Sequence, residues 1–184
     1  MSPFLIGVLG YVVVTAAASF PFMLRAHAEF ERQGKWSPST AIMSGIVMHG
    51  HFIATLALSW LDRGSLFALS LAGSIVGALL FIGGAVIIYL GRYAYGSQER
   101  VYGLLEDKLI QHGIYRHTRN PQYLGYSGMF LGASIAAGSG LALLSTLLFS
   151  VIIHVFITRV EEPHMRRTFG NFFDQYAQTV RRYV

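Results

Sequence analysis

Long uncharged apolar segments alternate with short polar ones along the first half of this chain. Three of these segments, at residues 3–24, 40–61 and 65–90, match the roughly 20 apolar residues that a bilayer-spanning helix needs. Only residues 62–64 separate the second segment from the third, so we expect these two helices to be antiparallel neighbours. The pattern predicts three membrane-spanning helices within residues 1–90.

The second half of the chain, residues 91–184, combines a polar stretch with one more apolar stretch. Residues 91–121 carry too much charge to cross lipid. The apolar stretch that follows, residues 128–157, is 30 residues long and is interrupted by Gly138-Ser139-Gly140, which is typical of a turn. We therefore expect a tight helical hairpin here, which brings the number of membrane helices to five.

The apolar residues of the C-terminal region recur with the spacing of one helix face. They are Phe169, Phe172, Phe173, Tyr176 and Val180. Basic residues flank this stripe, so we expect an amphipathic helix that lies on the membrane or covers the cytoplasmic mouth of the bundle. The predicted fold is all-α: a single membrane domain over residues 1–184, built as a polytopic membrane helix bundle of about five transmembrane helices with a C-terminal amphipathic helix.

Composition supports a membrane protein and excludes several other classes. The chain is 53% hydrophobic and 12% charged, whereas soluble domains carry roughly 25% charged residues. A soluble enzyme and a disordered chain are therefore excluded. The chain has no cysteine, which also excludes a disulfide scaffold and a thiolate metal site, and we expect no metal.

The basic residues indicate an orientation. With five spans, 13 of the 14 lysines and arginines fall on one side of the membrane. The positive-inside rule makes that side the cytoplasm, with the N-terminus outside and the C-terminus inside. We interpret the net charge of +5 as loop charge facing an acidic leaflet, not as nucleic-acid binding. The short chain and the lack of sorting signals favour a prokaryotic cytoplasmic membrane.

Two polar segments on the expected cytoplasmic side could carry chemistry. Residues 108–123 are dense in arginine, histidine, tyrosine and asparagine. Taken alone, they fit a solvated loop with basic anchors at the membrane edge. In the second segment, Glu161 and Glu162 follow an apolar helix, where carboxylates are costly unless they are paired or face water. Taken alone, these acids fit a cap on a helix that begins at Pro163.

Together, the two segments resemble the isoprenylcysteine carboxyl methyltransferase family and its relatives, the phosphatidylethanolamine N-methyltransferases. That family shows Gly-Ile/Val-Tyr, Arg-His-Pro-x-Tyr, a membrane hairpin, paired glutamates, Phe-Gly and two spaced tyrosines. The corresponding residues here are Gly113-Ile114-Tyr115, Arg119-Asn120-Pro121-Gln122-Tyr123, the hairpin, Glu161-Glu162, Phe169-Gly170 and Tyr176. Asn120 replaces the family histidine, and Phe173 replaces the first of the two tyrosines.

The resemblance implies S-adenosylmethionine as the methyl donor and a lipophilic small molecule or lipid as the acceptor, reached from the surrounding membrane lipids. The cofactor-binding residues would be Lys108, Leu109, Ile110, Tyr115, Arg119, Asn120, Pro121, Tyr123 and Glu161. An amine acceptor needs a proton acceptor, for which Glu162, His112 and His117 are candidate catalytic residues, whereas a carboxylate acceptor needs none. Arg159 is the arginine nearest to the position, about one turn before the paired acids, where the eukaryotic carboxyl methyltransferases bind substrate.

Two other functions remain open at this point. Sterol-type membrane reductases share an Arg-His-Pro-x-Tyr element and use NADPH, although they resemble larger bundles. A small membrane subunit that binds haem or a partner protein is the non-enzymatic alternative. Buried histidines such as His49, His51 or His154 could serve a haem. His49 and His51 point to different sides of a helix, so they cannot hold one metal together.

Overall fold

Serine side chains set the starts of most of the long helices. The computed structural model describes residues 2–105 and 108–184. At Ser2, Ser37, Ser70 and Ser139 the hydroxyl accepts a hydrogen bond from a backbone N–H in the first turn of the following helix. Proline occupies the first turn after Ser2 and Ser37, where its missing N–H costs nothing.

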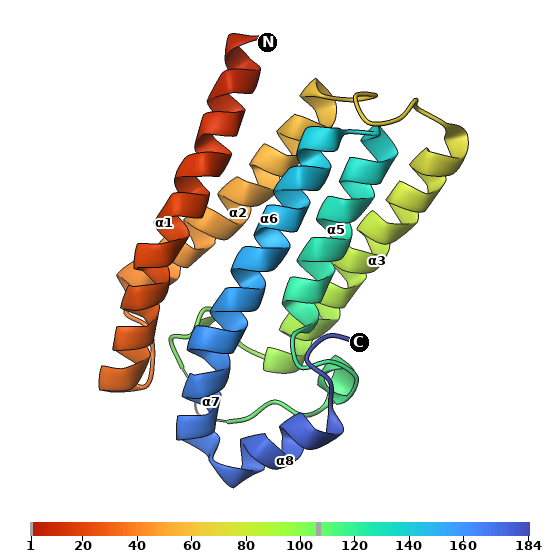
Figure 1. Ribbon diagram of the computed structural model, residues 1–184. Helices are drawn as coiled ribbons and strands as arrows, with labels where there is room; N and C mark the ends of the chain where they lie inside the picture. Colours follow the sequence, from red (N-terminus) through yellow and green to blue (C-terminus); the bar gives the residue numbers. More distant parts are fainter. Residues whose placement is uncertain (1, 106–107) are drawn as a thin grey trace.

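Five long helices form the bundle (Figure 1). They are α1 (Pro3–Gln33), α2 (Pro38–Leu61), α3 (Leu71–Tyr95), α5 (Pro121–Ala137) and α6 (Gly140–Phe156). The shorter elements are α4 (Gln98–Val101), η1 (Gly113–Arg116), η2 (Ile157–Glu161), α7 (Glu162–Phe169) and α8 (Asn171–Thr179). The described residues are thus helical wherever they are regular, which confirms the predicted all-α class.

Four helical stretches among the described residues are long and apolar enough to cross a membrane. Three of them are α1, α2 and α3, and the fourth runs from α6 into α7 over Gly140–Phe169. Helix α5 has 17 residues and lies alongside α3 and α6 in the bundle (Figure 1). The hairpin turn at Gly138-Ser139 agrees with the predicted one, although α5 begins at Pro121, seven residues before the apolar stretch.

The expectation that the second and third spans are neighbours is wrong. Helix α3 packs mainly on α5, and α2 packs on α1, α5 and α6. The connection is also longer than predicted, because α3 begins only at Leu71. The Gly64 and Leu66 amides donate hydrogen bonds to the Ala137 and Gly138 carbonyls, so this loop pairs with the hairpin turn, while the Ser65 amide donates to the Asp62 carbonyl within the loop.

Four glycines bring α3 and α5 into close contact. They are Gly77 and Gly84 on α3 and Gly125 and Gly132 on α5. A Cβ atom on Gly84 would lie 2.5 Å from the Gly125 carbonyl oxygen, and one on Gly77 would lie 2.5 Å from the Gly132 carbonyl oxygen. Small residues of this kind let helix backbones approach closely in membranes. We call this contact of the four glycines the glycine seam. It holds the start of α5, and therefore the polar segment before it, against α3.

The C-terminal region forms two short helices, whereas the sequence predicted one. Gly170 has a φ of 52°, which only glycine adopts readily, and it turns the chain between α7 and α8. Phe173 and Tyr176 of the predicted stripe are buried, but Phe172 is exposed. Figure 1 shows α7, α8 and the segment before α5 gathered at one end of the bundle, which we call the tail end.

Candidate functional site

The first polar segment is held in place by its tyrosines. Tyr115 lies in η1 and is buried against Tyr95, with ring centroids 5.5 Å apart. The Tyr176 hydroxyl donates to the Tyr115 carbonyl oxygen at 2.7 Å, and the Gln122 amide donates to the Tyr115 hydroxyl at 3.3 Å. Burial raises the pKa of Tyr115 well above its usual range, so this hydroxyl stays neutral.

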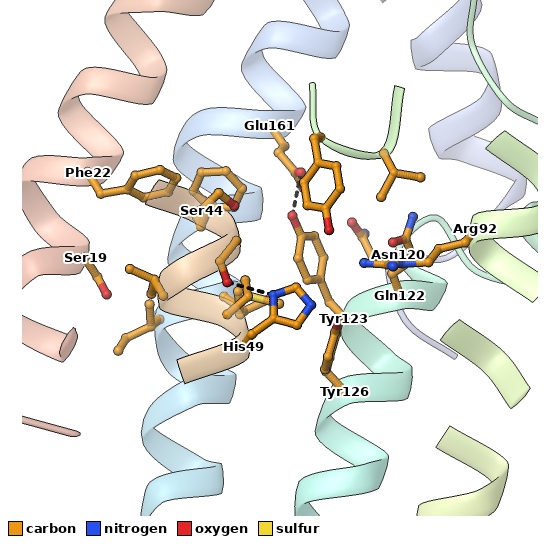
Figure 2. Close-up of a pocket in the computed structure, with 18 of the residues that line it drawn as sticks. Ser19, Phe22, Ser44, His49, Arg92, Asn120, Gln122, Tyr123, Tyr126 and Glu161 are labelled. Carbon is orange, nitrogen blue, oxygen red and sulfur yellow. Dashed lines mark hydrogen bonds between the residues drawn. The ribbon is translucent and has the colours of Figure 1, made fainter. Parts of the chain in front are cut away.

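The paired glutamates point to different partners. Glu161 is the last residue of η2, a single π-helical turn at the end of α6, and Glu162 begins α7; such turns are frequent at functional sites. The Tyr123 hydroxyl donates to Glu161 Oε1 at 2.7 Å (Figure 2). The buried Glu162 carboxylate instead accepts two hydrogen bonds from Arg182, from Nε at 2.8 Å and from Nη2 at 2.9 Å. Arg119 Nη2 lies 3.3 Å from Glu162 Oε1.

Residues 181 and 182 lie along the segment that precedes α5. The Arg119 amide donates to the Arg181 carbonyl oxygen at 3.0 Å. The Asn120 side-chain amide donates to the Arg182 carbonyl oxygen at 3.0 Å, and the Thr118 hydroxyl donates to the same oxygen at 3.2 Å. Asn120, which replaces the family histidine, therefore uses its amide to hold the C-terminal residues. This network joins the two polar segments through Arg182.

Two adjoining cavities open at this network. The inner cavity, of about 130 Å³, lies among α1, α2, α3, α5 and α6, and its lining is more apolar than polar, with residues such as Phe22, Met48 and Phe156. The outer cavity, of about 140 Å³, lies beneath α7 and α8. The two cavities are nearly equal in volume, so they differ in the side chains that line them and not in size. Their shared lining residues include Tyr95, Tyr115, Arg119, Asn120, Tyr123 and Glu161.

Most of the residues predicted from the sequence meet at these cavities. Lys108, Leu109, Ile110 and Glu162 line the outer cavity alone, while Tyr115, Arg119, Asn120, Tyr123 and Glu161 line both. The other three predicted residues lie elsewhere. Pro121 is buried beside Gly91 of α3 and lines neither cavity. His112 and Arg159 are exposed and also line neither, so the structure does not bring them together with the rest.

The outer cavity has an aromatic wall that the sequence interpretation missed. Phe30 of α1 stacks on His164 of α7 at 3.8 Å and on Trp36 at 5.3 Å, measured between ring centroids. Trp36 is buried, and its Nε1 has no hydrogen-bond partner among the residues that the structure describes. The one signal for this wall was a tryptophan in the short polar connection after α1, on the same predicted side as both polar segments.

A comparison with family models decides the family. The model described as phospholipid methyltransferase matches residues 72–172, which include both polar segments and the hairpin between them. The chain belongs to this family. It is therefore a methyltransferase, as the sequence predicted, and the match favours this activity over the reductase and haem-binding alternatives.

The relatives of this methyltransferase include enzymes of two kinds. Phosphatidylethanolamine N-methyltransferase B of Dictyostelium discoideum is 26% identical and aligns with 89% of this chain and 84% of its own. A probable protein-S-isoprenylcysteine O-methyltransferase of Oryza sativa subsp. indica is 34% identical over 58% of each chain. Their names point to nitrogen in one case and oxygen in the other as the methylated atom. No solved structure matches.

Proposed function

We propose that this methyltransferase takes the methyl group from S-adenosylmethionine and transfers it to a lipophilic acceptor at the tail end of the bundle. One observation carries the proposal. A more polar outer cavity and a more apolar inner cavity share a wall that contains Tyr115, Tyr123 and Glu161. A polar donor and a lipid acceptor need two such compartments, and methyl transfer needs their reacting atoms to meet.

The chemistry of the outer cavity fits S-adenosylmethionine, which supplies a methyl group on a cationic sulfonium. Trp36 and Phe30 offer aromatic faces to a purine or a cation. Trp36 Nε1 and Arg119 Nε are buried donors at this cavity that have no partner in the described ranges, and such donors are rare in folded proteins. Arg119 would hold the amino-acid carboxylate, and Glu161 would attract the ammonium group.

The inner cavity fits the apolar part of a lipid acceptor. Its walls carry phenylalanine, methionine and isoleucine side chains from α1, α2 and α6. Such a cavity lets a lipid reach the shared wall from within the bundle, away from water. Exclusion of water protects the methyl group from hydrolysis while the acceptor is being aligned.

Glu161 is better placed than Glu162 to act as the proton acceptor. Both oxygens of Glu162 are already committed to Arg182 and Arg119. Glu161 lines both cavities and accepts a hydrogen bond from Tyr123. If the acceptor is an amine, Glu161 would take its proton. If the acceptor is a carboxylate, no base is needed, and Glu161 would serve only the donor.

Trp36 provides a direct test of donor binding. The other tryptophan, Trp60, is 70% exposed. In the Trp60→Phe variant, titration with S-adenosylmethionine or its demethylated product should change the Trp36 fluorescence, with a dissociation constant in the micromolar range. Glu161→Ala and Arg119→Ala should each weaken binding by roughly tenfold or more, because each removes a charged partner.

Arg116→Ala is the matched control for this titration. Arg116 is exposed, lies next to Tyr115 and lines neither cavity. Its variant should bind the donor like the parent protein. An absence of any fluorescence change or binding heat with well-folded protein would contradict the proposal. An equal loss of affinity in the Arg116 variant would show that the effect reflects only the charge of the tail end.

A further inference from the structure

We infer that Arg92 forms an anion-binding subsite in the inner cavity, which binds the negatively charged group of the lipid acceptor. The inference rests on the proposed function and adds the residue that recognises this group. A phosphodiester and a carboxylate share this chemistry, and both are compatible with the geometry.

Arg92 is held at the cavity by the packing of α3 on α5. It lies in the last turn of α3, directly after Gly91. A Cβ atom on Gly91 would lie 2.9 Å from Gln122 Cγ and 3.3 Å from Pro121 Cγ, so the backbone of α3 presses on the start of α5. Figure 2 shows the Arg92 side chain reaching toward Gln122 and Asn120, which also line the inner cavity.

The Arg92 guanidinium has unused hydrogen-bonding capacity. Its Nε atom is buried and makes no hydrogen bond within the described part of the chain. The guanidinium lies over the Tyr102 ring, whose centroid is 5.8 Å from the guanidinium carbon. A buried guanidinium donor that lacks a partner costs free energy unless a ligand satisfies it. Arginine is also the side chain best suited to bind phosphate or carboxylate with two parallel hydrogen bonds.

The charges around the inner cavity favour an anion at Arg92. The charged side chains that line this cavity are Arg92, Arg119 and Glu161. Arg119 is paired with Glu162, and Glu161 accepts a hydrogen bond from Tyr123. Within residues 2–105 and 108–184, no acidic side chain forms a salt bridge with Arg92. An acidic headgroup would therefore supply the missing partner, while the apolar tail would occupy the Phe22 and Phe156 side of the cavity.

Steady-state kinetics with a labelled methyl donor test this subsite. The acceptors are phosphatidylethanolamine, which carries a phosphodiester, and farnesylcysteine, which carries a carboxylate. For the acceptor that is methylated, Arg92→Gln should raise KM by roughly tenfold to a hundredfold, and Arg92→Lys should raise it less because the charge remains. The identity of the methylated acceptor assigns the subsite to phosphodiester or carboxylate.

The controls separate this inference from the proposed function. Donor binding by Arg92→Gln should match wild type, because Arg92 does not line the outer cavity. Arg116→Gln should leave KM unchanged. An unchanged KM in Arg92→Gln, an equal rise in Arg116→Gln, or methylation of neither acid-bearing lipid by protein that binds the donor would overturn the subsite. Wild-type protein that fails to bind the donor would contradict the proposed function instead.

Binding of non-reacting probes gives a readout that does not depend on catalysis. Octyl phosphate and octanoate carry the anionic groups in question, and octanol has the same chain without a charge. In a neutral detergent, calorimetry should show that wild-type protein binds at least one of the two anions more tightly than octanol. Arg92→Gln should abolish that preference. Equal affinity of the wild-type protein for all three probes would overturn the inference.

Discussion

The buried Glu162 carboxylate attaches residues 181–184 to the wall of the outer cavity. Arg182 binds both of its oxygens. Arg119, which belongs to the other polar segment, lies 3.3 Å from the same carboxylate. The hydrogen bond to Glu162 raises the pKa of Arg182 further above its already high value, so its charge is permanent. Removing one partner of a buried ion pair is costly because the other charge is left without full compensation.

Arg182→Gln should therefore weaken donor binding even though Arg182 does not line either cavity. With one guanidinium lost, Arg119 would have to compensate Glu162 alone and would be less available to the donor. We expect the dissociation constant for S-adenosylmethionine to rise roughly tenfold or more. Isothermal calorimetry on detergent-purified protein measures this change.

Arg181 is the matched control for Arg182. It is the neighbouring arginine, it is exposed, and its side chain donates a hydrogen bond to the Val184 carbonyl oxygen at 3.5 Å, away from both cavities. Arg181→Gln should bind the donor like wild type and melt at the same temperature. If both variants lost affinity equally, general electrostatic attraction would explain the result and the role assigned to Arg182 would be wrong.

The sequence identified the residues of the two polar segments because they carry a recognisable order and spacing. Tyr115, Arg119, Asn120, Tyr123 and Glu161 are indeed brought together around the two cavities. Trp36 and Arg182 are different. They reach the site from opposite ends of the chain, and packing between distant helices places them there. Their local sequence carries no motif that predicts this.

At the scale of helices, α3 and α5 depend on their glycine seam. Adjacent glycines on α3 differ sharply in their surroundings. A Cβ atom on Gly83 would meet nothing within 4 Å, whereas one on Gly84 would lie 2.5 Å from the Gly125 carbonyl oxygen and 2.8 Å from the Met129 amide. The backbone of a helix cannot move away locally as a flexible side chain can, so a larger residue at Gly84 must separate the helices.

Gly84→Ala should destabilise the protein by about 1–3 kcal/mol, the usual cost of overpacking a close contact. Gly83→Ala, its control, should be neutral or slightly stabilising, because alanine is the better helix former. Reversible unfolding in detergent, followed by circular dichroism, gives both free energies. Equal stability of the two variants would mean that the seam is looser than these distances require.

Helix ends were predicted less well than helix centres. Hydropathy located the apolar cores of α1, α2 and α3, but it extended the third segment back to residue 65. Residues 64–66 are apolar or neutral, yet the Gly64 and Leu66 amides bond to carbonyls at the α5–α6 turn, so these residues form a loop. Hydropathy also stopped the first segment at residue 24, whereas α1 continues to Gln33 through charged residues. Local hydropathy therefore predicts neither the start of α3 nor the end of α1.

At the scale of the whole molecule, the direction of successive helices determines where the chemistry lies. Figure 1 shows α1 descending from the N-terminus to the tail end, α2 rising, α3 descending, α5 rising and α6 descending. Both polar segments and the α1–α2 connection therefore lie at the tail end, with the 62–70 loop and the hairpin turn at the other. We propose five crossings with the tail end in the cytoplasm, as the basic residues indicate.

Single cysteines can test this topology, because the chain has none of its own. Arg63→Cys lies in the 62–70 loop, and Gln98→Cys and Gln178→Cys lie at the tail end; all three positions are exposed. In intact cells, a membrane-impermeant maleimide should label only the first. The other two should react after permeabilisation. Labelling of Gln98→Cys and Arg63→Cys from the same side would show that α3 does not cross the membrane, which would contradict the five crossings.

The π-helical turn at Ile157–Glu161 has a consequence for how the chain tolerates insertions and deletions. One residue removed within this turn would restore regular α-helical spacing, but it would rotate α7 by about 100° relative to α6. Glu162 would then leave Arg182, and His164 would leave Phe30, although no side chain of the site had been mutated. The turn therefore sets the rotation of α7 relative to α6, and with it the position of the α7 side chains at the outer cavity. Insertions and deletions are expected in the loops and not in this turn.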